Sequence, residues 1–269
     1  LQTSTTSTFY MYYGSSTASG YAAGDTYGSQ NVWTNNYRAV YHLEESQAGT
    51  GAADLYRDST SAAAHGDDDV VATDKTGQLG LGQEFNNANS DNIEIPNTVL
   101  DGQTDVTVSY WYRTNTNDYM TVLSGARDNT GDGANEYLLW FQDRNDVQFF
   151  SHGDPRVNFD IFNINDNTYR YYVSVRDDTN NQTRFYIDAN EDNQSPASDT
   201  MTALSIASGG LFIGVDQDSI GGSFGQELDG ELDELRVSSG VRSSSWISNT
   251  FLNQNAPTSF YTVGSEETE

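Results

Sequence analysis

The amino-acid sequence predicts an all-β protein, an antiparallel two-sheet sandwich with one short helix near the C-terminus. Short runs of alternating apolar and polar residues recur from residue 38 onward. Clusters of Asn, Asp and Gly, such as residues 128–133 and 177–181, separate these runs. They favour turns because glycine tolerates a positive φ, and Asn and Asp side chains bond to the local backbone. Helical periodicity is nearly absent, so antiparallel strands joined by turns are expected.

Twelve segments have the composition and alternation of strands. In chain order they are Arg38–Leu43, Gln83–Phe85, Asn92–Ile95, Val106–Thr114, Tyr119–Ser124, Glu136–Gln142, Val147–Ser151, Tyr169–Arg176, Thr183–Asp188, Leu211–Val215, Leu232–Ser238 and Ser259–Val263. The segment Ser243–Leu252 has helical spacing instead, because Trp246, Thr250 and Phe251 recur at i, i+4 and i+5. Its serines can cap the helix, which is therefore expected to begin near residue 243.

Composition divides the chain into three parts. Residues 1–37 form an arm rich in Ser, Thr, Gly and Tyr, in which Thr8–Tyr13 has the pattern of a strand. Residues 38–264 hold the other predicted strands and the helix, and residues 265–269 form an acidic tail. The chain does not begin with methionine and no signal-peptide pattern opens it, so we expect a mature or excised part of a longer protein.

The charge of the chain is strongly negative. Its 269 residues include 12 Lys+Arg and 39 Asp+Glu, for a formal charge of −27, and Lys75 is the only lysine. Such a chain repels phosphate backbones and anionic lipids, so we expect no nucleic-acid partner and no binding to anionic membranes. The carboxylates lie largely between predicted strands. This halophilic-like pattern suits salty or calcium-rich water, and we expect stability to rise with added salt or calcium.

Two further absences narrow the classes of function. The chain has no cysteine, which excludes disulfides and thiolate metal sites. No apolar run reaches about 18 residues, so insertion of a helix into a membrane is not expected. The core, with or without a bound metal, therefore has to stabilise the fold without covalent cross-links.

Three predicted strands share an unusual outward face. If residues 105–113, 170–176 and 183–188 lie in one sheet, alternation places aromatic rings and guanidinium groups on its solvent side. Rings of this kind stack on sugar C–H faces, and arginine binds hydroxyls or carboxylates with two donors. Alternatively, these side chains only cover the sheet and pair with Asp or Glu across strands. The predicted carbohydrate-binding residues are Trp111, Arg113, Tyr172, Arg176, Arg184 and Tyr186.

Several segments over residues 38–264 resemble the laminin-G-like, concanavalin A-like jelly-roll domains of bacterial and archaeal surface proteins. The strongest match is the order of a glycine-ending strand, an Asp-Glu-Leu-Arg-Val strand and a short helix. The matching segments are Tyr37–Glu45, Arg57–Thr60, Leu79–Phe85, Asn92–Pro96, Val106–Tyr112, Tyr171–Val175, Phe185–Asp188, Leu211–Gly214, Leu228–Val237 and Val241–Ser243. The earlier segment Phe9–Gly14 resembles the last strand of a domain that often precedes this jelly roll, so residues 1–37 are interpreted as the tail of such a domain.

The resemblance also implies one calcium ion between the first and last strands. Carried over by position, Asp233 is the first candidate ligand, with Glu44 and Asp58 as weaker ones and backbone carbonyls and water completing the six to eight oxygens that calcium takes. The alternative is that backbone N–H groups alone satisfy Asp233.

Catalysis at the last strand is not expected. Laminarinase-type hydrolases of this fold use a Glu-x-Asp-x-Glu strand, whose period of two places all three carboxylates on one face. Here the order is Glu231-Leu232-Asp233-Glu234, so Glu234 is predicted to point away from Glu231 and Asp233.

These observations favour a non-catalytic, secreted or cell-surface module that binds a polysaccharide or surface glycan and is stabilised by calcium, with a role in adhesion. The alternative is a structural subunit or spacer of a surface filament or adhesin, whose arm pairs with a copy of itself or with a neighbouring surface-protein domain. A polysaccharide-degrading enzyme is the less favoured third possibility.

Overall fold

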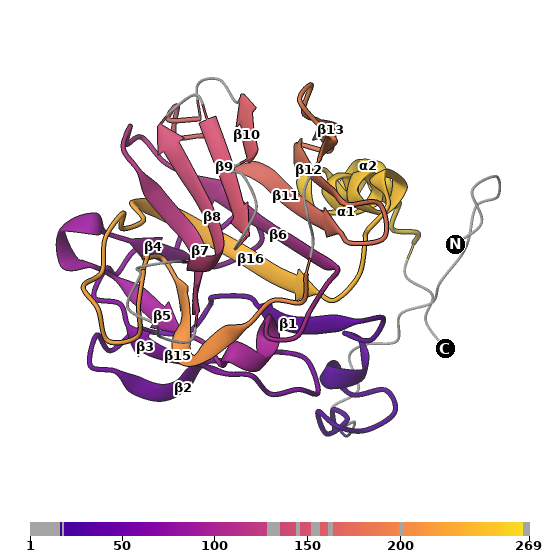
Figure 1. The fold of residues 1–269 in the computed structure, drawn as a ribbon. Helices are drawn as coiled ribbons and strands as arrows, with labels where there is room; N and C mark the ends of the chain where they lie inside the picture. The colour runs from indigo at the N-terminus through magenta and orange to yellow at the C-terminus, as the bar shows by residue number, and fades with distance from the viewer. Residues whose placement is uncertain are drawn as a thin grey trace.

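The computed structural model describes residues 17, 19–127, 135–143, 146–151, 157–160, 164–198 and 202–265. The predicted strand at Thr8–Tyr13 and the acidic tail after residue 265 lie outside these residues. Two antiparallel sheets of eight strands each pack face to face, and the predicted all-β sandwich with a short C-terminal helix is confirmed (Figure 1).

The first sheet, called sheet A, contains both the first and the last strand of the fold. Its order is β1-β16-β6-β11-β12-β13, with β4 also paired to β16 and β14 to β12. The bounds are β1 Tyr37–Tyr41, β4 Gln83–Phe85, β6 Val106–Arg113, β11 Arg170–Asp177, β12 Gln182–Ile187, β13 Asn190–Glu191, β14 Ala197–Ser198 and β16 Gly230–Ser238.

The second sheet, called sheet B, has the order β10-β9-β8-β7-β15-β5-β3-β2. Its bounds are β2 Ala52–Tyr56, β3 Gly66–Asp69, β5 Asn92–Glu94, β7 Met120–Arg127, β8 Asn135–Asp143, β9 Asp146–Ser151, β10 Val157–Asp160 and β15 Ile206–Ile213. The strands β2, β3, β10, β13 and β14 have no counterpart among the twelve predicted segments. The sequences of β2, β3, β13 and β14 are short and lack alternation, whereas the four residues of β10 alternate and could have been predicted.

The two α-helices of the described residues lie in the C-terminal part of the chain. The main helix, α1, spans Ser244–Asn255, and the side chain of its N-cap Ser243 accepts a hydrogen bond from the Trp246 N–H, as the serine pattern predicts. The short α2 spans Pro257–Phe260, so the predicted strand at Ser259–Val263 is wrong. Three single turns of 3₁₀ helix complete the set: η1 Ser29–Asn31, η2 Asn87–Asn89 and η3 Asn97–Val99.

The main core lies between the two sheets and is rich in aromatic side chains. Along β6, Val106, Val108, Tyr110 and Tyr112 point into it, which confirms the predicted alternation of that strand. On the neighbouring β11 the prediction is reversed, because Tyr172 joins the main core and stacks on Tyr110 at 5.5 Å between ring centroids. Each face of β11 carries a tyrosine, but both valines lie on the outer face with Tyr171, so alternation alone indicated the wrong inward face.

A second, smaller core lies on the outer face of sheet A, under α1 (Figure 1). It contains Trp111, Tyr171, Val173, Val175, Tyr186 and Ile247, and Phe251 of α1 packs against it. The outer face of sheet A is therefore covered where this second core and α1 lie. No helix among the described residues is long and apolar enough to cross a membrane.

Candidate functional site

The predicted sugar-binding face of sheet A is largely inside the protein. Trp111 is only 1% exposed, because α1 lies over it. Its indole Nε1 donates to Gln254 Oε1 at 2.8 Å, and its ring stacks on Phe251 with centroids 5.8 Å apart. Tyr172 is buried in the main core and Tyr186 in the second core. The expectation that these rings form a solvent-exposed platform is therefore wrong.

The three arginines of the predicted platform have protein partners. Arg176 is buried and donates to the backbone carbonyls of Thr104 at 2.8 Å and Thr202 at 2.7 Å. Arg113 forms a bidentate pair with Glu231, with both N···O distances at 3.0 Å. Arg184 pairs with Glu191 at 3.0 Å. Arg113 and Arg184 therefore agree with the alternative interpretation, in which arginines on the strand faces pair with acidic residues.

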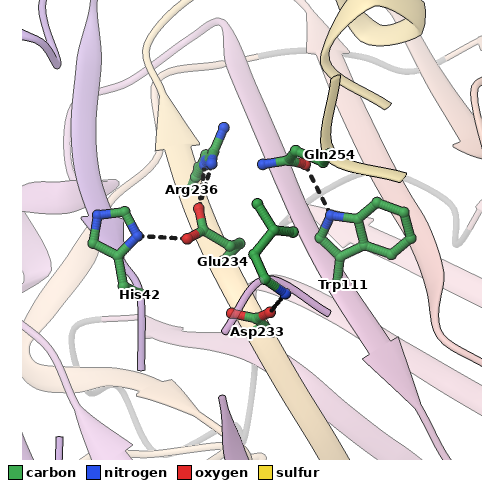
Figure 2. A network of polar contacts seen from close by, with 7 residues as sticks. His42, Trp111, Asp233, Glu234, Arg236 and Gln254 are labelled. Atoms are coloured by element: carbon green, nitrogen blue, oxygen red, sulfur yellow. Dashed lines mark hydrogen bonds and ion pairs between the residues drawn. The ribbon is translucent and has the colours of Figure 1, made fainter. Parts of the chain in front are cut away.

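A β-bulge in β16 sets the geometry of the carboxylates on the outer face of sheet A. The pairing of β16 with β6 shifts between Asp233 and Arg236, and Glu234 has a φ of 54°. Leu232 and Leu235 both lie in the main core, so the two residues between them are displaced from the inner face. Alternation predicted that Glu234 points away from Asp233, and the bulge overturns that prediction (Figure 2).

Glu234 lies between two cationic side chains (Figure 2). His42 Nδ1 is 2.6 Å from Glu234 Oε1, and Arg236 Nε donates to Glu234 Oε2 at 3.0 Å. The hydrogen bond with Glu234 raises the pKa of His42, although burial acts in the opposite direction. Burial alone would raise the pKa of Glu234, but His42 and Arg236 together hold it below its usual range. The Trp33 ring, 4.8 Å from the Arg236 guanidinium, joins the segment before β1 to this network.

The His42–Glu234 pair predicts a pH dependence of stability. Because the folded-state pKa of His42 is raised, its contribution is full below the unfolded value of 6.5 and is lost as the pH rises through the folded value. The effect should not exceed about 1 kcal/mol, since the His42 side chain is 33% exposed and solvent screens the pair. Thermal unfolding of the chain and of His42→Asn between pH 5.5 and 8.5 measures it. A stability difference between the two proteins that does not change with pH would contradict the prediction.

Asp233 is buried beside this network. Its Oδ2 accepts the Leu79 N–H at 2.8 Å. Its Oδ1 is buried and has no hydrogen-bond partner among the described residues. Burial raises the pKa of Asp233 to about 7, despite the hydrogen bonds from the backbone. A proton can therefore neutralise this carboxyl near neutral pH without any metal ion.

The calcium site implied by the resemblance does not form from the three expected carboxylates. Asp58 is buried and saturated, because its carboxylate accepts the backbone N–H groups of Val40, Thr60 and Ala64 at 2.9–3.0 Å and the Thr60 hydroxyl at 2.7 Å. Glu44 is exposed. No group of three or more His, Cys, Asp or Glu side chains within the described part of the chain is arranged to hold a metal ion. The donor set Asp233, Glu44 and Asp58 thus does not fit a bound calcium.

A different group of residues lies on the outer face of sheet B. Leu139 and Phe141 of β8 point into the main core, so Trp140 points outward, and its cross-strand partner on β7 is Thr121. Tyr119, just before β7, is 47% exposed, and its ring centroid is 5.5 Å from that of Trp140. The sequence predicted both strands, and their alternation could have revealed Trp140.

A loop packs against the same face of sheet B. The carbonyl of Gln226 accepts the Thr121 N–H at 2.7 Å, and the Phe224 ring contacts Phe212 of β15 at 5.2 Å. Thr121 Oγ1 and Gln226 Oε1 are buried and lack hydrogen-bond partners among the described residues. No sequence signal pointed to this loop, because its contacts with β7 and β15 depend on the tertiary fold.

The charge of this face is negative at its β3–β5 end. Asp67 and Glu94 are directly opposite in the β3–β5 pair, and Glu94 lies outward because Ile93 and Ile95 are in the core. Burial and then the charge of Asp67 raise the pKa of Glu94. Asp118 is exposed next to Tyr119. An anionic ligand would meet electrostatic repulsion along this face.

Both a protein-family match and similar solved structures agree with the fold. Residues 86–248 match the family described as the Concanavalin A-like lectin/glucanases superfamily, and no curated protein matches the sequence. Among solved structures, domain 4 of an extracellular arabinanase from Geobacillus stearothermophilus, in complex with arabinotriose, has a TM-score of 0.54 at 16% identity. That match covers 80% of this chain and 97% of the domain.

Two other solved structures belong to different proteins. Trypanosoma rangeli sialidase in complex with sialic acid has a TM-score of 0.56 at 14% identity over 83% of this chain, but the match covers only 34% of the sialidase. A pentraxin from Limulus polyphemus has a TM-score of 0.47 at 17% identity, over 56% of this chain and 71% of the pentraxin. The structural likenesses describe the fold, whereas the family match spans more than half of the sequence. The chain belongs to the Concanavalin A-like lectin/glucanases superfamily.

Proposed function

We propose that the chain is an extracellular, non-catalytic module that binds neutral glycans through the outer face of sheet B. The observation that carries the proposal is the half-exposed Tyr119 ring, supported from behind by Trp140. Aromatic rings with one free surface bind the C–H faces of sugars, and a buried neighbour holds such a ring in place before the ligand arrives. The resemblance of the fold to a domain solved with arabinotriose is consistent with this role.

The charges of Asp118 beside Tyr119 and of the β3–β5 end of sheet B favour a neutral ligand. Asp118 can accept hydrogen bonds from sugar hydroxyls, as carboxylates commonly do. Asp67 and Glu94 are direct cross-strand partners on the same face, so two carboxyl groups lie side by side there. Sialic acid and uronic acids carry carboxylates of the same sign, so we propose that they bind more weakly than neutral arabino-, gluco- or galacto-oligosaccharides.

The contacts of the β16 carboxylates support a role without catalysis. Glu231 is held by both nitrogens of its bidentate pair with Arg113, and Asp233 is buried under the loop that contains Leu79. A retaining glycosidase needs two carboxyl groups that both reach the scissile bond. We therefore expect no release of reducing ends when the chain is incubated with β-glucans or arabinans.

Loss of the exposed ring should weaken binding. Tyr119→Ala is expected to reduce affinity for a neutral oligosaccharide about tenfold, which corresponds to the roughly 1.4 kcal/mol that one aromatic contact provides. A glycan array identifies the ligand, and isothermal titration calorimetry then measures the affinity. Tyr21→Ala is the matched control, because Tyr21 is 68% exposed in the segment before β1. Binding that is equal in both variants, or binding confined to anionic glycans, would contradict the proposal.

A further inference from the structure

The only lysine of the chain anchors a loop that crosses from β3 to β4. Lys75 Nζ donates to the Leu43 carbonyl at 2.8 Å and to Gln83 Oε1 at 2.6 Å. Gln83 is fully buried, and the same Oε1 also accepts the Tyr56 hydroxyl at 3.0 Å. One ammonium group therefore connects the end of β1 to the first residue of β4.

The far part of the same loop is attached to the last strand of the fold. The Leu79 N–H donates to Asp233 Oδ2 at 2.8 Å. Within the loop, Thr76 and Leu81 form a β-bridge, and the Gly82 N–H donates to the Lys75 carbonyl at 3.0 Å. The loop thus lies between Leu43, just after β1, and Asp233 of β16, and this is the region where the resemblance places calcium.

Acidic side chains surround the ammonium. The charges of Glu45, Asp68, Asp233 and Glu44 all favour its protonated form. Burial acts against them and lowers the pKa of Lys75 to about 8, so the group still carries its charge at pH 7. A fixed positive charge inside a strongly acidic chain offsets repulsion that would otherwise act between these carboxylates.

Several of the oxygens that a divalent ion would use in this region are already bound, although Asp233 Oδ1 has no hydrogen-bond partner among the described residues. The Leu43 carbonyl takes the ammonium, Asp58 is saturated by N–H and hydroxyl donors, and Asp233 Oδ2 takes the Leu79 N–H. Calcium requires six to eight oxygens, and the described residues hold no cluster of three metal-ligating side chains. We propose that the Lys75 ammonium is the resident cation between β1 and β16, and that this region of the chain binds no calcium.

Thermal unfolding of three full-length proteins tests the proposal. The unchanged chain, Lys75→Met and Arg57→Met are compared in EDTA, in calcium and in magnesium, at equal ionic strength and pH 7. Arg57 is exposed at the end of β2, so its replacement removes the same charge without an internal contact. Lys75→Met should lower Tm by about 5 °C more than Arg57→Met, because it leaves two buried acceptors without this donor. The unchanged chain should melt at the same temperature in calcium and magnesium.

Two results would overturn the proposal: a Tm of the unchanged chain that calcium raises above its value in magnesium, or equal effects of the two substitutions. If Lys75→Met does not fold, the unchanged chain still decides the question. Labelling with ¹⁵N-lysine gives a single side-chain signal, because Lys75 is the only lysine. That signal should titrate near pH 8 and should not move when calcium is added, whereas a shift specific to calcium would show the ion entering the region.

Discussion

Replacing Trp111 with alanine is expected to destabilise the protein by about 3–5 kcal/mol, the range observed for removal of a buried tryptophan. The ring fills the space between sheet A and α1, and its Nε1 satisfies the buried Gln254. Chemical denaturation monitored by circular dichroism measures the loss. A solvent-facing sugar platform would predict instead a stable variant that no longer binds glycan.

Trp111→Phe is the matched control for this experiment. It keeps an aromatic ring against Phe251 but removes the donor to Gln254. We expect it to cost about 1–3 kcal/mol, the penalty for one unsatisfied buried polar group. If both variants were as stable as the unchanged chain, α1 would not cover sheet A in solution.

Replacing Asp233 with asparagine is expected to stabilise the protein at pH 8. The folded-state pKa of Asp233 is about 7 against a usual 3.8, so the folded chain binds this proton more tightly than the unfolded chain. The contribution of the carboxyl is full below about pH 4 and is lost as the pH rises through 7. A difference of three pKa units corresponds to about 4 kcal/mol. The unsatisfied amide of asparagine costs about 1–2 kcal/mol, so the expected gain in stability is about 2–3 kcal/mol.

The sign of that change separates two roles for Asp233. A calcium ligand would be needed in its charged form, so Asp233→Asn would then lose stability in the presence of calcium. Urea unfolding of both proteins at pH 5 and pH 8, with EDTA and with calcium, distinguishes the cases. For a buried carboxyl that a proton neutralises, we expect a difference that favours Asn only at the higher pH and is the same with and without calcium.

The strands and the helix that could be predicted are those whose own residues carry the pattern of that element. The inward residues of β6 and β12 followed from period-two spacing, and Ser243 caps α1 through its own side chain. β3 could not be predicted, because Gly66–Asp69 has low strand propensity and forms a strand by pairing with β5 and β2. The segment 259–263 has apolar residues at strand spacing, but its first two residues end a short helix that begins at Pro257.

The candidate site was harder to predict than the fold. Period-two alternation states which residues share a face, but it does not state what covers that face. α1 covers Trp111 and Tyr186, which no pattern within β6 or β12 could indicate. The bulge at Glu234 likewise changes the face of a carboxylate by inserting one residue into the register. Tyr119 was within a predicted strand, yet its exposure depends on lying just before β7 and beside Trp140.

Glycan binding by sheet B rather than by sheet A can be decided with three variants and one ligand. The affinity for the same neutral oligosaccharide is measured by isothermal titration calorimetry for Tyr119→Ala on sheet B, and for Arg113→Ala and Arg184→Ala on sheet A. We expect that only Tyr119→Ala loses affinity, by about tenfold. Loss of binding in Arg113→Ala or Arg184→Ala, with Tyr119→Ala unchanged, would place the ligand on sheet A and contradict the proposed site.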